Sequence, residues 1–143
     1  PKDNVISINV DKPLTQEDEE VVLSISLTAR PNQFDQFIAE KSLKEITITP
    51  SDNSFGNGCI GHPEEGKILM DTVHKLLHHL VSEYDIKKIH LLPCASNAAC
   101  VFLGKAIDNY HPECIIYDFE RNTMTPRLLI NPITDGNQIQ VAN

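Results

Sequence analysis

The sequence predicts an α/β fold in which a mostly parallel sheet carries helices on both faces and an antiparallel strand at its C-terminal end. Short apolar runs of strand length alternate along the chain with segments that repeat apolar residues at helical spacing. Strands that alternate with helices in this way form a parallel sheet with right-handed crossovers. The last two strand-like runs are separated only by a short polar turn, which favours an antiparallel pair. The length of 143 residues and the hydrophobic content of 41% suit one globular domain.

The N-terminal part of the chain is predicted to hold two strands joined by a linker. Residues 5–10 alternate apolar and polar side chains, which predicts a short edge strand. Residues 11–20 are charged and contain proline, so we expect a solvated linker. Residues 21–29 give the clearest strand. One of its faces is apolar, and the other carries Val22, Ser24, Ser26 and Thr28. Small hydroxyl side chains in such a strand are useful beside a polar ligand.

Two helices and a strand are expected in the middle of the chain. Residues 33–42 predict a short helix, because Phe34, Phe37 and Ile38 recur at spacings of three and four. Residues 45–49 predict a strand that ends before a proline. Residues 66–84 predict a long helix with a stripe of apolar residues, namely Leu69, Val73, Leu76, Leu77, Leu80 and Tyr84.

Residues 88–110 read as a strand, a tight turn and a helix in immediate succession. The apolar run that includes Leu91 predicts a strand that ends at Pro93, because proline has no backbone donor. Ser96 or Asn97 suits the N-cap of the helix that follows. Its apolar face is expected to comprise Ala98, Ala99, Phe102, Leu103, Ala106 and Tyr110.

The C-terminal part is expected to add two strands and a tail. Residues 114–119 and 127–131 have strand character, and the polar residues after Pro132 predict a disordered tail. We therefore divide the chain into an N-terminal strand and linker at residues 1–20, a domain at residues 21–132, and a polar tail at residues 133–143.

These elements predict a Rossmann-like three-layer sandwich with a topological switch point. Counted from the strand at residues 21–29, the expected strand order is 2-1-3-4, followed by the antiparallel strand. In such sheets ligands bind outside the carboxyl ends of the strands, where the strand order reverses. The segments that meet there are residues 27–32 and residues 93–97.

The helix that begins near Ser96 is a candidate anion site. The first turn of a helix usually attracts acidic side chains to its positive end, yet no acidic residue occurs between Lys88 and Asp108. Small residues before the helix would let a ligand approach backbone N–H groups. An ordinary strand-to-helix connection is the alternative interpretation, and these residues alone favour it.

The composition limits the classes of partner. The net charge is −8, and three arginines and nine lysines are scattered along the chain, which argues against a long DNA or RNA footprint. No window is apolar enough for a membrane span. The four cysteines show no paired spacing, so we expect reduced thiols in a cytosol. The chain begins with Pro1 rather than Met, so we expect a fragment of a longer protein.

Two further patterns in the sequence match ligand-binding motifs only in part. The glycines of residues 56–61 match a dinucleotide-binding pattern, but five residues separate them from the helix and include Glu64 and Glu65, which would repel a pyrophosphate. We expect this long loop to be a flap instead. His74 and His78 have the spacing of helical metal ligands but lack a third ligand, so we expect a structural role, no metal site and no cofactor.

Over residues 21–132 the sequence resembles a SAVED domain, the sensor module of bacterial anti-phage signalling systems, which is related to the CARF domains of type III CRISPR ancillary proteins. The resemblance rests on VVLSISLTARP, GKILMDTVHKLLHHL, and IHLLPCASNAACVFLG followed by HPECIIYDFE. These segments are similar to the family's His-containing strand, its small-residue turn, its helix with a late glycine (Gly104), and its closing Tyr-rich strand.

The resemblance implies a CARF-like sandwich that binds a cyclic oligonucleotide second messenger in CBASS-like defence. Binding would then drive oligomerisation or activate a fused effector outside this chain. The ligand-binding residues implied by position are Ser26, Thr28, Ala29, Arg30, Pro93, Cys94, Ala95, Ser96, Asn97 and Phe119. The family typically fuses two CARF-like units and this chain holds one, so a dimer or a head-to-tail stack would supply the other half. The expected location is the bacterial cytoplasm, with any membrane tether in a segment outside this chain.

Two other function classes remain open at this point. A ring nuclease that cleaves a cyclic oligoadenylate would need a charged or basic group near the phosphates, and Arg30, His62 or Lys67 could serve. A flavodoxin-like or response-regulator-like protein is a weaker match, because a phosphoacceptor site wants acidic residues at strand ends and residues 21–32 contain none.

Overall fold

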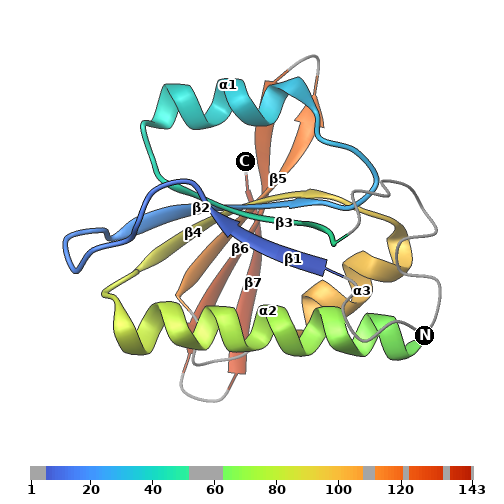
Figure 1. Ribbon diagram of the computed structural model, residues 1–143. Helices are drawn as coiled ribbons and strands as arrows, with labels where there is room; N and C mark the ends of the chain where they lie inside the picture. Colours follow the sequence, from blue (N-terminus) through green and yellow to red (C-terminus); the bar gives the residue numbers. More distant parts are fainter. Residues whose placement is uncertain (1–5, 52–62, 108–111, 121–122, 134–135, 143) are drawn as a thin grey trace.

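The computed structural model describes residues 6–51, 63–107, 112–120, 123–133 and 136–142. Its centre is a seven-stranded sheet with the strand order β1-β3-β2-β4-β5-β6-β7. Helix α1 covers one face of this sheet, and α2 and α3 cover the other (Figure 1). The elements in chain order are β1 (Ile6–Val10), β2 (Glu20–Ser26), α1 (Asn32–Lys41), β3 (Glu45–Pro50), α2 (Pro63–Glu83), β4 (Lys88–Cys94), α3 (Asn97–Lys105), β5 (Glu113–Glu120), β6 (Thr123–Ile133) and β7 (Gly136–Val141).

The predicted fold class and strand order are confirmed. Strands β3, β2, β4 and β5 are parallel neighbours in the expected order 2-1-3-4. Strand β6 returns antiparallel to β5, as the short turn between them predicted. The carboxyl ends of β2 and β4 therefore lie side by side, at the point where strand order reverses.

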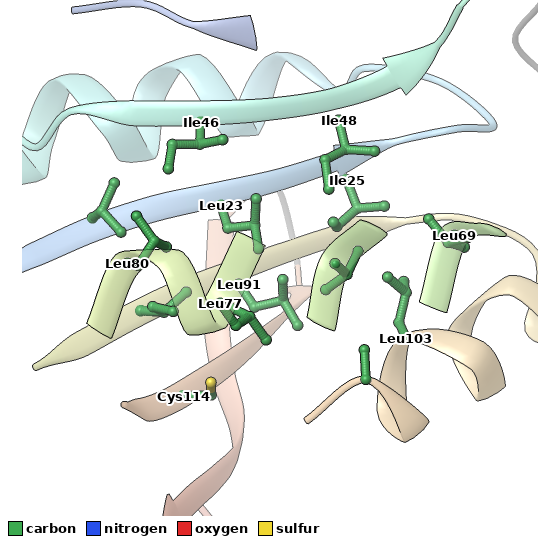
Figure 2. Packing of buried hydrophobic residues seen from close by; sticks show 14 of the residues in the cluster. Leu23, Ile25, Ile46, Ile48, Leu69, Leu77, Leu80, Leu91, Leu103 and Cys114 are labelled. Carbon is green, nitrogen blue, oxygen red and sulfur yellow. The ribbon is translucent and has the colours of Figure 1, made fainter. Parts of the chain in front are cut away.

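The larger part of the hydrophobic core lies between the sheet and α2. Leu69, Leu77 and Leu80 of α2 pack against side chains of β2, β3 and β4, and Leu103 of α3 joins them (Figure 2). Together with Leu23, these residues are at least 96% buried. The predicted apolar stripe of the long helix is thus the face that holds α2 on the sheet.

A smaller core lies under α1 on the opposite face. Phe34 and Phe37 of α1 pack with Val22, Leu92 and Tyr117 of three adjacent strands. Because side chains alternate along a strand, Ser24 and Ser26 lie on the same face of β2 as Val22. The two predicted faces of the strand at residues 21–29 are confirmed, although β2 itself runs from Glu20 to Ser26.

Strand β4 continues through Pro93, so the prediction that this proline ends the strand is wrong. Cys94 accepts backbone hydrogen bonds from Leu27 and Thr28, so its backbone faces β2 and that of Pro93 faces β5. Pairing between β4 and β5 stops at Leu91 with Ile116. The missing N–H of Pro93 therefore removes no hydrogen bond from the ladder.

The two helices on the α2 face differ in length from the prediction. Helix α2 begins at Pro63, so Glu64 and Glu65 lie in its first turn rather than in a loop. Helix α3 ends at Lys105 and Ala98 is exposed, whereas Ala99 and Leu103 are buried as expected. The loop glycines of residues 56–61 and Tyr110 lie outside the described residues.

Both flanks of the predicted domain belong to the same sheet. The expected edge strand is confirmed as β1, which pairs antiparallel with β3. The expected disorder of residues 133–143 is wrong, because Gly136–Val141 forms β7 and pairs with β6. In β7 the apolar side chains of Ile139 and Val141 are 64% and 74% exposed, so burial of an apolar face does not account for this edge strand.

Candidate ligand site at the carboxyl edge of the sheet

The two predicted ligand turns meet where β2 and β4 end. Ser26 is the register partner of Cys94. Beyond the strands, the N–H groups of Leu27 and Thr28 both donate to the carbonyl oxygen of Cys94, at 2.9 and 3.1 Å. The Thr28 hydroxyl lies 3.2 Å from the Cys94 Sγ atom. The two segments predicted to meet, residues 27–32 and 93–97, are therefore in contact through Leu27, Thr28 and Cys94.

The N-terminus of α3 opens beside these turns with no negative charge of its own. Ser96 is the N-cap, and its Oγ atom accepts a hydrogen bond from the N–H of Ala99 at 3.2 Å. The first turn of α1 contains an acidic residue and that of α2 contains two, whereas that of α3 contains none. Among the described helices, α3 is therefore the one whose partial positive charge is not neutralised from within.

The first residues of α3 are accessible from outside. Asn97 and Ala98 are exposed, and Ala95 and Ser96 are half-buried. Backbone N–H groups at an accessible helix N-terminus are donors that suit phosphate or carboxylate oxygens. The arrangement can hold an anion through these backbone donors.

Ser26 adds a polar group with unused hydrogen-bonding capacity. Ser26 is fully buried, and its Oγ atom has no hydrogen-bond partner among the described residues. Leaving a buried hydroxyl without a partner costs about 1–3 kcal/mol. The sequence placed Ser26 at the candidate site but could not show that its buried hydroxyl lacks a partner.

Arg30 is not turned toward this edge. Its guanidinium lies under the first turn of α1, where Nη1 donates to Glu45 Oε2 at 2.9 Å and Nη2 donates to Asp35 Oδ1 at 2.7 Å. Burial lowers the pKa of Arg30, but the hydrogen bonds with Glu45 and Asp35 outweigh this effect and leave the pKa above its usual value. The predicted contact between Arg30 and a ligand would have to compete with these carboxylates.

Two cysteine thiols, Cys100 in α3 and Cys114 near the start of β5, have raised pKa values. Burial and the neighbouring Cys94 raise the pKa of the exposed Cys100. Burial raises the pKa of Cys114 to about 12. Since the thiolate is the reactive form, a raised pKa makes a thiol a poorer nucleophile.

A buried polar network that the sequence did not predict crosses the sheet under α1. His90 is 4% exposed, and its Nδ1 and Nε2 atoms lie 2.7 Å from the Tyr117 hydroxyl and 2.8 Å from Glu20 Oε1. Burial raises the pKa of Tyr117 to about 12, and the hydrogen bond with His90 lowers the pKa of Glu20. The network joins β2, β4 and β5 away from their carboxyl ends, so it supports the fold rather than the site.

The other predicted residues belong to different elements from the two turns or lie outside the described ranges. Phe119 belongs to the part of β5 that pairs with β6 and extends beyond the last residue paired with β4. Lys67 lies near the start of α2, and His62 is outside the described residues. The rings of His74 and His78 lie 4.4 Å apart, and His74 Nδ1 is 3.1 Å from the Ala106 carbonyl oxygen. Within the described ranges no three metal-ligating side chains gather.

A family model matches most of the chain. The model of the "SMODS-associated and fused to various effectors sensor domain", abbreviated SAVED, matches residues 1–130. No curated protein matches the sequence. No helix in the described part of the chain is long and apolar enough to cross a membrane.

Solved structures share the fold at low sequence identity. The chain is similar to an Acinetobacter baumannii Cap4 SAVED/CARF-domain containing receptor in its structure with the cyclic trinucleotide 2'3'3'-cAAA, with a TM-score of 0.69 and 20% identity over 88% of this chain and 27% of that one. The structure of that receptor with 3'3'3'-cAAA gives a TM-score of 0.72 at the same identity and coverage. The structure without a stated ligand gives 0.66 and 16% identity over 87% of this chain and 25% of that one. The chain therefore spans about a quarter of the length of the receptor chains that it matches.

Proposed function

The chain belongs to the SAVED family of sensor domains, and from this membership we propose that it binds a cyclic oligonucleotide second messenger in bacterial anti-phage defence. The observation that carries the proposal is the accessible N-terminus of α3, which has no acid in its first turn and opens at the switch point of the sheet. A cyclic oligonucleotide presents phosphates, the groups that such a helix end binds. The similar Cap4 receptor has been solved with cyclic trinucleotides of adenine, which supports this ligand class.

In this proposal the phosphate contacts are made by backbone donors. The N–H groups of residues 95–97 and of the first turn of α3 face the ligand, and Ser96 caps the helix without adding charge. The turn at residues 26–29 forms the other side of the site, because Leu27 and Thr28 are hydrogen-bonded to Cys94. Neutral donors suit an acidic protein of net charge −8, which has few cations to spare for phosphate binding.

We extend the proposal to assembly. A cyclic trinucleotide has several phosphates and bases, whereas this sheet has one switch point between β2 and β4. A second CARF-like unit, from another copy or from the rest of a longer protein, would cover the open side of the ligand. Binding would then be transmitted as oligomerisation or to an effector in the bacterial cytoplasm.

Calorimetric titration tests the proposal directly. The protein is titrated with a cyclic triadenylate and, as a control, with the linear triadenylate of the same composition. We expect saturable binding of the cyclic ligand and a much weaker signal from the linear one. Equal or absent binding of both would contradict the proposal.

The same mixture distinguishes a sensor from a ring nuclease. In the described part of the chain, the Cys100 thiol of α3 has a raised pKa, Arg30 is ion-paired with Glu45 away from this edge, and the first turn of α3 contains no carboxylate. We therefore expect the cyclic ligand to be recovered intact after prolonged incubation. Accumulation of linear product would instead establish the ring nuclease.

A further inference from the structure

We infer that Arg30 is a positioning residue, which fixes the turn after β2 in its ligand-binding geometry and makes no contact with the ligand itself. The inference rests on the proposed function and assigns the role of one charged side chain within it. Arg30 follows the turn at residues 26–29, and its guanidinium is turned back under α1.

The guanidinium joins three elements of the fold. Its Nη1 and Nη2 atoms bond to the two carboxylate oxygens of Glu45 at the start of β3, at 2.9 and 3.2 Å. Nη2 also bonds to Asp35 in α1, at 2.7 Å, and Nη1 lies 3.4 Å from the hydroxyl of Ser24 in β2. A two-pronged arginine–carboxylate pair has a defined geometry that a single ammonium group cannot reproduce.

Burial makes this pair difficult to exchange for a ligand contact. The side chain of Glu45 is 10% exposed and that of Arg30 is 29% exposed. Ser24 is fully buried and also donates a hydrogen bond to Glu45 Oε2. A ligand phosphate that recruited Arg30 would leave a buried carboxylate without its cation, which is strongly unfavourable. Asp35, by contrast, is 69% exposed and is the weaker of the two anchors.

The turn is thereby held at both ends. At its start Leu27 and Thr28 are hydrogen-bonded to Cys94 of β4, and at its end Arg30 is attached to Glu45 of β3. Pro31 follows with φ −66° as the N-cap of α1, and no side chain caps that helix. A binding turn fixed in advance does not lose conformational freedom when the ligand arrives, so the attachment contributes to affinity without touching the ligand.

The variant Glu45→Gln distinguishes a positioning role of Arg30 from a direct ligand contact, because the two roles predict opposite changes in ligand affinity. If Arg30 contacted the ligand, removing the competing carboxylate charge would free the guanidinium and strengthen binding. If Arg30 positions the turn, the same change loosens it and weakens binding. We expect Glu45→Gln to lower the affinity roughly tenfold, which is the scale of coupling between residues in one hydrogen-bond network.

A double variant tests rescue. Arg30→Gln alone leaves the Glu45 carboxylate buried without a cation, whereas Arg30→Gln combined with Glu45→Gln gives a neutral pair that can still form a hydrogen bond. A positioning role predicts that the double variant binds more tightly than Arg30→Gln. A direct contact predicts no recovery, because the cation is absent from both.

The experiment is a calorimetric titration of each variant with cyclic triadenylate, with melting temperatures measured in parallel to confirm that each variant is folded. Arg127→Ala is the matched control, because it removes one exposed arginine from β6, which is separated from β4 by β5. We expect weaker binding by Glu45→Gln, partial recovery in the double variant and unchanged binding by Arg127→Ala. Unchanged or tighter binding by folded Glu45→Gln overturns the inference while the proposed function stands. A parent protein that binds no cyclic oligonucleotide overturns both.

Discussion

Ser96 caps α3 with a neutral group, and this choice keeps the end of the helix positive. Its hydroxyl satisfies the Ala99 N–H and leaves the other donors of the first turn available. Asp and Asn are equally good N-caps, but only Asp adds a negative charge. We expect Ser96→Asp to weaken binding of a cyclic oligonucleotide by roughly tenfold or more. Ser96→Asn should bind like the parent in the same titration, and equal affinities of the two variants would place the phosphate elsewhere.

Glu20 gives the buried His90 network a pH dependence. Its pKa is lowered by the hydrogen bond with His90, despite some desolvation. A carboxyl group whose pKa is lower in the folded protein than in the unfolded chain stabilises the fold at pH values above the unfolded-state pKa, here 4.5. This stabilisation is lost as the pH falls through the lower pKa of the folded state. We therefore expect the difference in unfolding free energy between the parent and Glu20→Gln to be largest near neutral pH. Urea denaturation over a pH series measures it, and a difference that grows on acidification would contradict this account.

At the scale of elements, two glycines report on how α2 and α3 pack. A Cβ atom at Gly66 of α2 would lie 2.1 Å from the ring of Phe102 in α3, so alanine there forces the ring to move. A Cβ atom at Gly104 would meet nothing within 4 Å. We expect Gly66→Ala to destabilise the fold by roughly 1–3 kcal/mol. Gly104→Ala should stabilise it by up to about 1 kcal/mol, because alanine loses less conformational entropy in a helix. Urea denaturation of both variants measures these changes in unfolding free energy. Changes of the same sign in the two variants would contradict the packing described.

The sequence patterns that describe a whole element predicted the fold well. The alternation in residues 21–29 and the helical spacing in residues 66–84 depend on burial of a face, so they place β2 and α2 and orient them correctly. Local rules failed where the neighbouring strand decides the outcome. Pro93 is tolerated because β5 has already diverged from β4, and β7 forms because β6 extends far enough to pair with it.

The candidate site was predictable to the extent that it depends on backbone. Local sequence narrows the N-cap of α3 to Ser96 or Asn97 and predicts its acid-free first turn, and topology predicts the meeting of the two turns. Local sequence does not predict the direction of a long side chain, since Arg30 pairs with Glu45, which is fifteen positions away. The same holds for His90, whose partners Glu20 and Tyr117 are 70 and 27 positions away.

At the scale of the whole molecule, charge opposes self-association in the absence of ligand. The chain has a net charge of −8, so two copies repel each other on approach. A ligand that bridges the α3 ends of two copies would offset this repulsion at one seam, giving a closed dimer or a growing stack. We expect light scattering to report a larger particle after addition of cyclic triadenylate and no change with the linear form. A particle that stays monomeric at saturating ligand would limit the site to one chain.

A melting-temperature screen against cyclic di-, tri- and tetranucleotides, each paired with its linear counterpart, tests the central claim of cyclic oligonucleotide binding most directly. A ligand that binds only the folded state at a hundredfold excess over its dissociation constant stabilises by about 2.7 kcal/mol. The account predicts that at least one cyclic ligand raises the melting temperature, that its linear counterpart does not, and that Ser96→Asp reduces the shift. A melting temperature unchanged by every cyclic ligand at saturating concentration would contradict it.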